Sequence, residues 1–149
     1  MEINIKKASK SEIDDILGLI NGLYDLNYIP FEKVRIRSAL EKLLDDESKG
    51  HVWTVHDMDD LIGYFIVILV FSLEYNGQIA IIDEMYIKYG HRNMGYGKAI
   101  LGVIEDFCKD RDVRIIALEV EKHNVNAQVF FQIKGFQKMD RVIMIKNVE

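Results

Sequence analysis

Apolar residues recur along this chain at two spacings, one typical of helices and one typical of strands. Both occur in the stretch 79–109, which opens with the apolar run 79–82 and continues through a turn containing Gly95 and Gly97. The residues that follow at helical spacing are Ile100, Leu101, Ile104, Phe107 and Cys108. The pattern predicts a strand, a glycine turn and a helix with one buried face.

The N-terminal third predicts one short strand and two helices. Ile3 and Ile5 alternate with polar residues, as in a strand. Ser9 and Glu12 have the spacing of a capping box, which predicts that a helix begins there. The apolar positions of that helix are Ile13, Ile16, Leu17, Ile20, Leu23 and Tyr24. Pro30 suits the first turn of a second helix that runs towards Asp46.

The rest of the chain predicts mainly strands. Their ranges are 51–56, 61–71, 79–87, 115–120 and 139–146. A short helix opens at Asn124 and is closed by Gly135 in a left-handed conformation. The predicted order is β-α-α-β-β-β-α-β-α-β, that of an α/β layered fold. A length of 149 residues predicts a single domain spanning 1–149.

Composition narrows the class of protein. The chain is 49% apolar and 29% charged, as is usual for a globular domain, and its net charge of −5 argues against nucleic-acid binding. The single cysteine, Cys108, cannot form an intrachain disulfide, which suits a reducing cytoplasm. The first ten residues lack the apolar segment of a signal peptide, and the longest apolar run, 64–71, is too short to span a bilayer. We therefore expect a cytoplasmic protein without membrane or nucleic-acid partners.

The glycine turn has the features of an anion site. The first N–H groups of a helix lack partners within it, and the helix dipole favours negative charge there. Residues without a Cβ atom let a phosphate approach the backbone. Nearby positive charge comes from Lys88, His91, Arg92 and Lys98. We therefore predict a pyrophosphate site.

Two other phosphate-binding motifs do not match this turn. The P-loop requires a glycine where the chain has Arg92 and a serine or threonine where it has Ala99, and the dinucleotide-binding motif requires a third glycine where it has Ile100.

Two motifs resemble those of the GNAT superfamily of N-acetyltransferases. The first is Arg92-x-x-Gly95-x-Gly97, which follows the strand segment 83–87. The second half of the family pattern is matched by Leu118, Val120, Asn124, Ala127, Phe130, Phe131, Gly135 and Phe136. The motifs occur in the order of the family and at its usual separation. The resemblance implies a mixed, splayed β-sheet flanked by helices, with acetyl-CoA as co-substrate.

The resemblance also implies where acetyl-CoA binds. Its pantetheine arm is expected along the backbone of Met85, Tyr86 and Ile87. Its pyrophosphate is expected on the turn formed by Arg92, Asn93, Met94, Gly95, Tyr96, Gly97 and Lys98. The second motif is expected to contribute Asn124, Ala127, Phe130 and Phe131. The histidines at 51, 56 and 91 lack the spacing of metal ligands, so we expect no metal.

In the usual mechanism of the family, a deprotonated amine attacks the thioester directly in a ternary complex. The resemblance assigns the N–H of Met85 to the developing oxyanion. Glu84 is the preferred general base, with Asp83 as the alternative. Strict strand alternation would send these carboxylates to opposite faces. Both residues also fit a simpler interpretation, as solvated carboxylates at the end of a strand or as groups that steer a cationic amine.

Phe131 departs from the tyrosine that often serves as the general acid of the family. The thiolate can leave unassisted or through water, another hydroxyl (Tyr86, Tyr89 or Tyr96) can replace the acid, or the chain can have lost catalysis and kept only acyl-CoA binding. We favour the first explanation. Two functions therefore remain open. One is acetyl transfer to a primary amine, with the negative charge favouring a small cationic acceptor. The other is a non-catalytic acyl-CoA-binding sensor or interaction module. The family also suggests a homodimer.

Overall fold

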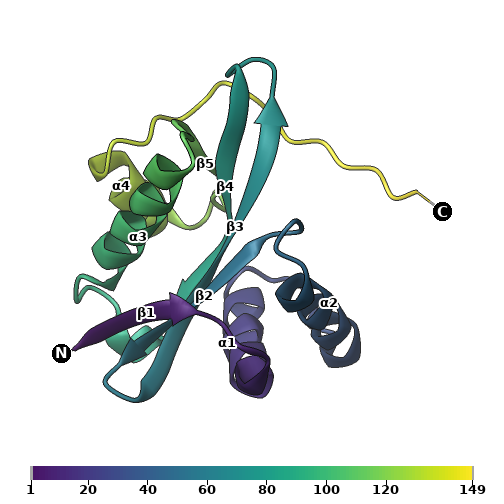
Figure 1. Cartoon of the computed structure of the whole chain (residues 1–149), viewed down its shortest axis with the longest axis vertical. Helices are drawn as coiled ribbons and strands as arrows, with labels where there is room; N and C mark the ends of the chain where they lie inside the picture. The colour runs from purple at the N-terminus through teal and green to yellow at the C-terminus, as the bar shows by residue number, and fades with distance from the viewer. Residues whose placement is uncertain (1, 149) are drawn as a thin grey trace. The chain divides into compact units, whose positions relative to one another are not determined.

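The computed structural model describes residues 2–148 and contains a mixed, five-stranded sheet (Figure 1). The strands are β1 (Ile3–Lys7), β2 (His51–Asp57), β3 (Asp60–Ser72), β4 (Gly77–Ile87) and β5 (Ile116–Leu118), and they lie in this order across the sheet. Neighbours from β1 to β4 are antiparallel, whereas β4 and β5 are parallel. The α/β class and the first five predicted strands are confirmed, although β5 is shorter than expected.

The described residues also form four α-helices: α1 (Ile13–Leu26), α2 (Lys33–Asp45), α3 (Tyr96–Asp110) and α4 (Val125–Ile133). The capping box before α1 is present, with the Ser9 N–H donating to Glu12 Oε1 at 3.0 Å. Short 3₁₀ turns cover Lys10–Glu12 and Tyr89–His91. Helix α2 begins three residues later than predicted, so Pro30 lies in the preceding loop rather than in its first turn.

The chain divides into two compact units, residues 1–119 and 120–149. The first contains the whole sheet with α1, α2 and α3. The second contains α4 and the segment that follows it.

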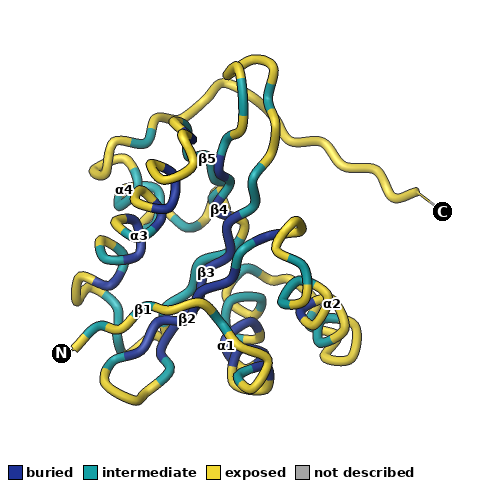
Figure 2. Tube along the Cα trace, viewed as in Figure 1, coloured by how far each residue is buried: buried dark blue, intermediate teal, exposed yellow. Residues whose placement is uncertain are grey.

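Helices pack on both faces of the sheet in the first unit. On one face, Tyr64 and Ile66 of β3 lie in a buried cluster with residues of α1, including Ile16. On the other, Phe65 stacks on Trp53 of β2 at 4.9 Å between ring centroids, and Trp53 meets Phe107 of α3 at 5.2 Å. The side chains of consecutive residues of β3 thus pack on opposite faces of the sheet, as the alternation of side chains along a strand requires. Figure 2 shows the buried positions concentrated in the central strands and on one side of α1 and α3.

The sheet is splayed between β4 and β5. The parallel pairing joins Ala80, Ile81 and Ile82 to Ile116–Leu118 and goes no further. Strand β4 nevertheless continues to Ile87, so within residues 2–148 the segment 83–87 has a paired strand only on its β3 side. The splayed geometry expected from the sequence is therefore present.

A β-bulge lies where the pairing with β5 ends. Ile66 of β3 pairs with Glu84 and Val67 pairs with Ile82, which leaves Asp83 as an extra residue. The extra residue interrupts the inward and outward alternation of β4. Strict alternation was the reason for expecting Asp83 and Glu84 on opposite faces, and that reason fails here.

In the second unit, Asn124 caps α4 and Gly135 follows the helix with φ of 98°, as predicted. The strand predicted over Met139–Lys146 is wrong, because these residues form no strand. Their apolar side chains are largely exposed, with Met144 at 88% and Ile145 at 89%. An alternation of apolar and polar residues shows only that a segment is suited to a sheet. To form a strand, its backbone must also hydrogen-bond to the backbone of a neighbouring strand.

Candidate active site

The main chain of β4 beyond Ile82 faces the open side of the splay at alternate residues. The Lys88 N–H donates to Ile62 O at 2.8 Å, which fixes the phase of the antiparallel ladder with β3. In such a ladder, hydrogen-bonded and non-hydrogen-bonded pairs alternate. Tyr86 therefore bonds to β3, whereas the N–H and C=O groups of Met85 and Ile87 point away from it. Five residues after Ile87, the side chain of Arg92 donates to Ile87 O at 3.0 Å, consistent with this phase.

Arg92 connects the end of β4 to the glycine turn. Besides its bond to Ile87, its guanidinium lies over the rings of Tyr86 and Tyr89, at 5.4 and 5.7 Å from their centroids. Cation–π contacts of this kind hold a side chain in place. The first residue of the turn motif thus has a structural role that the sequence does not reveal.

The turn leaves the N-terminus of α3 open to a ligand. Gly95 is the N-cap residue with φ of 89°, and no side chain caps the helix. The N–H groups of Tyr96, Gly97 and Lys98 are therefore available in the first turn of the helix. A Cβ atom built on Gly95 would meet no atom within 4 Å, so the space in front of the turn is free. Exposed Asn93 and Met94 complete the turn.

Tyr96 contributes to this turn only through its backbone. Its side chain is 2% exposed and its ring meets that of His91 edge-on, at 6.4 Å between centroids. Tyr86 and Tyr89 are the other two tyrosines whose hydroxyls can replace the general acid. The side chain of Tyr89 is 85% exposed. The Tyr86 hydroxyl instead reaches α1, where a Cβ atom on Gly22 would lie 2.5 Å from it.

Both carboxylate oxygens of Glu84 are held by hydrogen bonds from tyrosines. Its Oε2 accepts a hydrogen bond from Tyr24 of α1, and its Oε1 accepts one from Tyr64 of β3, both at 2.7 Å. Burial raises the pKa of Glu84, the two hydroxyls lower it, and Asp83 raises it further. Burial and the adjacent Glu84 in turn raise the pKa values of Tyr24 and Tyr64. Both phenols therefore stay protonated as donors.

Asp83, the second candidate base, sits at the bulge beside this network. Its side chain is exposed, although the neighbouring strands desolvate it enough to raise its pKa. Proximity to Glu84 adds charge repulsion, which favours the protonated form of Glu84. The two carboxylates are thus close electrostatically but differ in their contacts.

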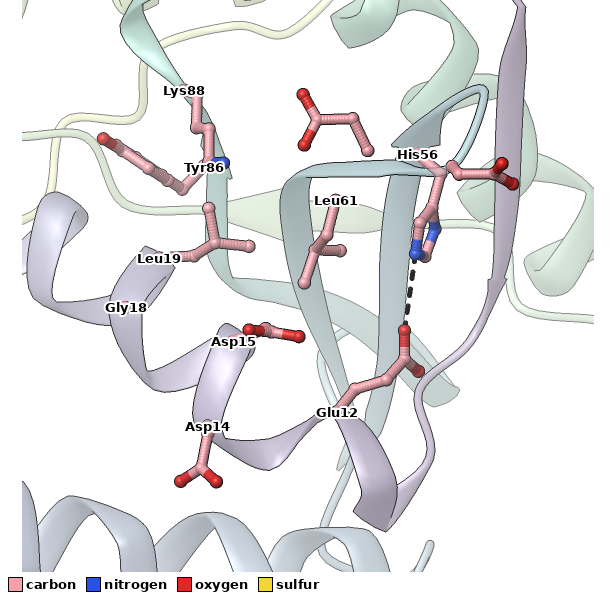
Figure 3. Close-up of a pocket in the computed structure, with 11 residues that line it drawn as sticks. Glu12, Asp14, Asp15, Gly18, Leu19, His56, Leu61, Tyr86 and Lys88 are labelled. Atoms are coloured by element: carbon pink, nitrogen blue, oxygen red, sulfur yellow. Dashed lines mark ion pairs between the residues drawn. The ribbon is translucent and has the colours of Figure 1, made fainter.

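An acidic pocket of about 670 Å³ opens between the start of α1, the β2–β3 turn and the end of β4 (Figure 3). Its lining includes five carboxylates, those of Glu12, Asp14, Asp15, Asp59 and Asp60. The basic groups in the lining are Lys88 and His56, whose Nε2 lies 3.4 Å from Glu12 Oε2. Tyr86 also lines the pocket, and it is two residues from Glu84. Asp59 and Asp60 lie between the predicted strands 51–56 and 61–71 and carry no motif.

The residues of the second motif have roles within their own unit. Asn124 Oδ1 accepts a hydrogen bond from the Ala127 N–H at 3.2 Å, so this side chain caps α4. Phe131 meets Phe130 and Phe136 edge-on, with ring centroids 5.2 and 5.3 Å apart. A phenyl ring at this position offers no proton donor.

The first unit brings Glu84, Asp83, Met85 and the turn 92–98 onto one strand and the helix that follows it. Sequence reasoning missed Tyr24 and Tyr64 as partners of Glu84. In the sequence, Tyr24 is one of the regularly spaced positions of the first helix and Tyr64 is part of an apolar run, and neither position points to Glu84. No spacing rule links three residues that come from three different elements.

Within residues 2–148, no cluster of ligating side chains suits a metal ion, and no helix is long and apolar enough to cross a membrane.

Comparisons with known proteins agree with this geometry. Two relatives from Bacillus subtilis (strain 168) are described as uncharacterized N-acetyltransferases. YhfO is 20% identical over 136 residues, 91% of each chain, and YycN is 26% identical over 99 residues, 66% of this chain and 62% of its own length.

Two solved structures share the fold. A possible acetyltransferase from Clostridium difficile 630 superposes with a TM-score of 0.86 at 22% identity, covering 100% of this chain and 99% of that one. The aminoglycoside 6'-N-acetyltransferase AAC(6')-Ig from Acinetobacter haemolyticus superposes with a TM-score of 0.82 at 18% identity, covering 98% of this chain and 99% of that one. The model of the Acetyltransferase (GNAT) family matches residues 20–136, and the chain therefore belongs to that family.

Proposed function

We propose that residues 1–149 form one N-acetyltransferase domain, which moves the acetyl group of acetyl-CoA to a primary amine. One observation carries the proposal: within residues 2–148, β4 has main-chain groups without a partner strand beyond Ile82 on one side, and the turn 88–95 connects it to a helix N-terminus without a side-chain cap. These two features suit the two parts of coenzyme A. An extended amide chain can pair with a strand edge, and a diphosphate can bind helix N–H groups.

Each part of the site has a role in this proposal. The N–H groups of the turn from Arg92 to Lys98 hold the diphosphate, and the outward-facing main chain of Met85 and Ile87 pairs with the pantetheine arm. The Met85 N–H donates to the thioester carbonyl oxygen, where negative charge grows during the reaction. The family resemblance also assigns Asn124, Ala127, Phe130 and Phe131 of the second motif to cofactor binding.

The reaction requires the protein mainly to position two substrates and to remove a proton. Bound acetyl-CoA supplies an activated acyl group with a thiolate leaving group. The amine nitrogen forms a bond to the carbonyl carbon, the carbon–sulfur bond breaks, and the proton of the amine passes to Glu84 directly or through water. Holding both reactants in place accounts for much of the acceleration expected from such a site.

The acidic pocket supports a small cationic acceptor. Five carboxylates against two basic groups give its lining negative charge, which attracts ammonium groups. Tyr86 links this pocket to the strand that carries Glu84. The aminoglycoside acetyltransferase with the same fold shows only that the fold suits such amines. Polyamines and aminoglycoside-like amines are therefore the first acceptors to test.

The test of cofactor binding uses the variants Gly95→Asp and Gly95→Asn. Both residues tolerate the left-handed conformation of Gly95, and a Cβ atom meets nothing there, so the two variants differ mainly in charge. We expect Gly95→Asp to weaken binding of coenzyme A in calorimetry by about tenfold or more, or roughly 1.4 kcal/mol, relative to Gly95→Asn. Equal binding by the two variants, or no binding by the native chain, would overturn the proposal.

A second function, a non-catalytic acyl-CoA sensor, is favoured by the missing proton donor at Phe131. Measuring release of free thiol over a panel of primary amines separates the two functions. Turnover on any amine supports the enzyme. Tight binding of coenzyme A without turnover on any amine supports the sensor.

A further inference from the structure

The buried network around Glu84 joins three elements that are distant in sequence. Tyr24 comes from α1, Tyr64 from β3 and Glu84 from β4, and each phenol occupies a different carboxylate oxygen at 2.7 Å. Tyr64 is fully buried, whereas Tyr24 is partly exposed at the surface of α1. Two donors on one carboxylate define its plane and its rotation, so Glu84 has little freedom to reorient.

Stability alone does not account for this arrangement. Burying a carboxylate carries a desolvation penalty, and apolar residues of similar volume are often neutral or stabilising at such positions. The surrounding cluster of α1 and β3 is apolar, and it contains Ile16, Leu17 and Ile66. A partly buried carboxylate with both oxygens hydrogen-bonded, in the part of β4 beyond its pairing with β5, is therefore a candidate for a functional role.

We propose that Tyr24 and Tyr64 are positioning residues for the general base: they hold the Glu84 carboxylate in one orientation and keep it ionised to accept the proton of the amine. This inference rests on the proposed function. It adds to that function an element, α1, whose first turns line the acidic pocket and whose Tyr24 donates a hydrogen bond to the base. Neither tyrosine touches the reacting atoms in this account, and each acts through Glu84.

The direction of the pH effect follows from the groups around Glu84. These are Tyr24 on α1, Tyr64 on β3 and Asp83 on β4 itself. Hydrogen bonds to the charged form lower the pKa of a carboxyl group, whereas burial and a neighbouring carboxylate raise it. Removing one hydroxyl takes away only a lowering effect, so the pKa of Glu84 must rise. The base is then protonated up to a higher pH, and the acidic limb of kcat/KM moves upward.

The experiment compares Tyr24→Phe and Tyr64→Phe with Tyr75→Phe, a tyrosine at the β3–β4 turn outside this network. Two quantities are measured in the full-length chain. One is the pKa of the Glu84 carboxyl group, from the ¹³C chemical shift during an NMR pH titration, with Glu84→Gln assigning the signal. The other is the acidic limb of kcat/KM for acetyl transfer. Calorimetry with coenzyme A serves as the control for cofactor binding.

We expect Tyr24→Phe and Tyr64→Phe each to raise the pKa of Glu84, and to move the acidic limb of kcat/KM to higher pH, by about one unit. Their affinity for coenzyme A should not change. Tyr75→Phe should change neither the pKa of Glu84 nor the acidic limb. An unmoved Glu84 pKa in both variants overturns the proposal. A raised Glu84 pKa with an unmoved limb also overturns it, because Glu84 is then not the base. Failure to bind coenzyme A would instead reject the proposed function, and the NMR titration would still decide whether the tyrosines hold Glu84.

Discussion

At the scale of single residues, the proposed proton transfers concern two positions, Glu84 and Phe131. Glu84 has two hydrogen-bonded oxygens and a raised pKa, properties expected of a base that works near neutral pH. Phe131 lies among other phenyl rings and can neither donate nor accept a proton. The chain thus has a candidate for removing the proton of the amine, but its second motif offers no acid for the thiolate.

The variant Phe131→Tyr tests whether the missing acid limits the rate. We expect no rise in kcat for thiol release, because a thiolate is a stable leaving group and does not require protonation by the protein. Phe136→Tyr, which adds a hydroxyl to the same aromatic cluster, is the matched control. A rise in kcat towards the 10²–10⁴-fold that acid–base help typically contributes, seen in Phe131→Tyr alone, would contradict this prediction.

At the scale of elements, the pair β3–β4 determines where the site lies. The bulge at Asp83 shifts the register so that Glu84, and not its neighbour, pairs with Ile66 on the face of α1. Gly63 allows the two strands to pair closely beyond the bulge. A Cβ atom there would lie 2.5 Å from both the Tyr86 carbonyl oxygen and the Ile87 side chain. The glycine is therefore required by the close approach of β4.

The variant Gly63→Ala should be destabilised for this reason. Overpacking of a well-packed interior typically costs about 1–3 kcal/mol in the free energy of unfolding, and here one of the clashing atoms belongs to the backbone. Urea denaturation followed by circular dichroism measures the change. Gly102→Ala is the control, because a Cβ atom on this exposed glycine of α3 meets nothing within 4 Å and should stabilise by about 0.5–1 kcal/mol. Equal stability of the two variants would count against the close approach.

At the scale of the whole molecule, the segment after α4 has the composition of a strand but forms none. Its exposed apolar residues are Met139, Val142, Ile143, Met144, Ile145 and Val148. Soluble monomers rarely expose contiguous apolar surface without a partner. The homodimer suggested by the family resemblance therefore remains a prediction to which this segment can contribute.

Sedimentation equilibrium tests the dimer. We expect the native chain to be dimeric and the double variant Ile143→Asp/Ile145→Asp to be largely monomeric, because paired surfaces do not tolerate two unpartnered charges. Val34→Asp, at an exposed apolar position of α2, is the control and should leave the mass unchanged. A native chain that sediments as a monomer would refute the prediction.

Much of the fold could be predicted because its signals are local. Periodicity located α1, α3 and the first five strands, and Ser9, Asn124 and Gly135 marked helix ends by their capping chemistry. The glycine turn was predictable for the same reason, since a strand, two glycines and a helix follow one another directly. One prediction that is wrong, the strand over Met139–Lys146, rested on local alternation alone, and in the described part of the chain no neighbouring strand pairs with this segment.

The sequence by itself determined the order of the elements as far as α4, the glycine turn before α3 and the presence of two neighbouring carboxylates in β4. Only the tertiary structure decided how these carboxylates differ. The bulge places Glu84 opposite Ile66, and folding brings Tyr24 and Tyr64 to its two oxygens across 60 and 20 residues of chain. Local propensities act over a few residues, whereas the environment of a buried charge is set by every element packed around it.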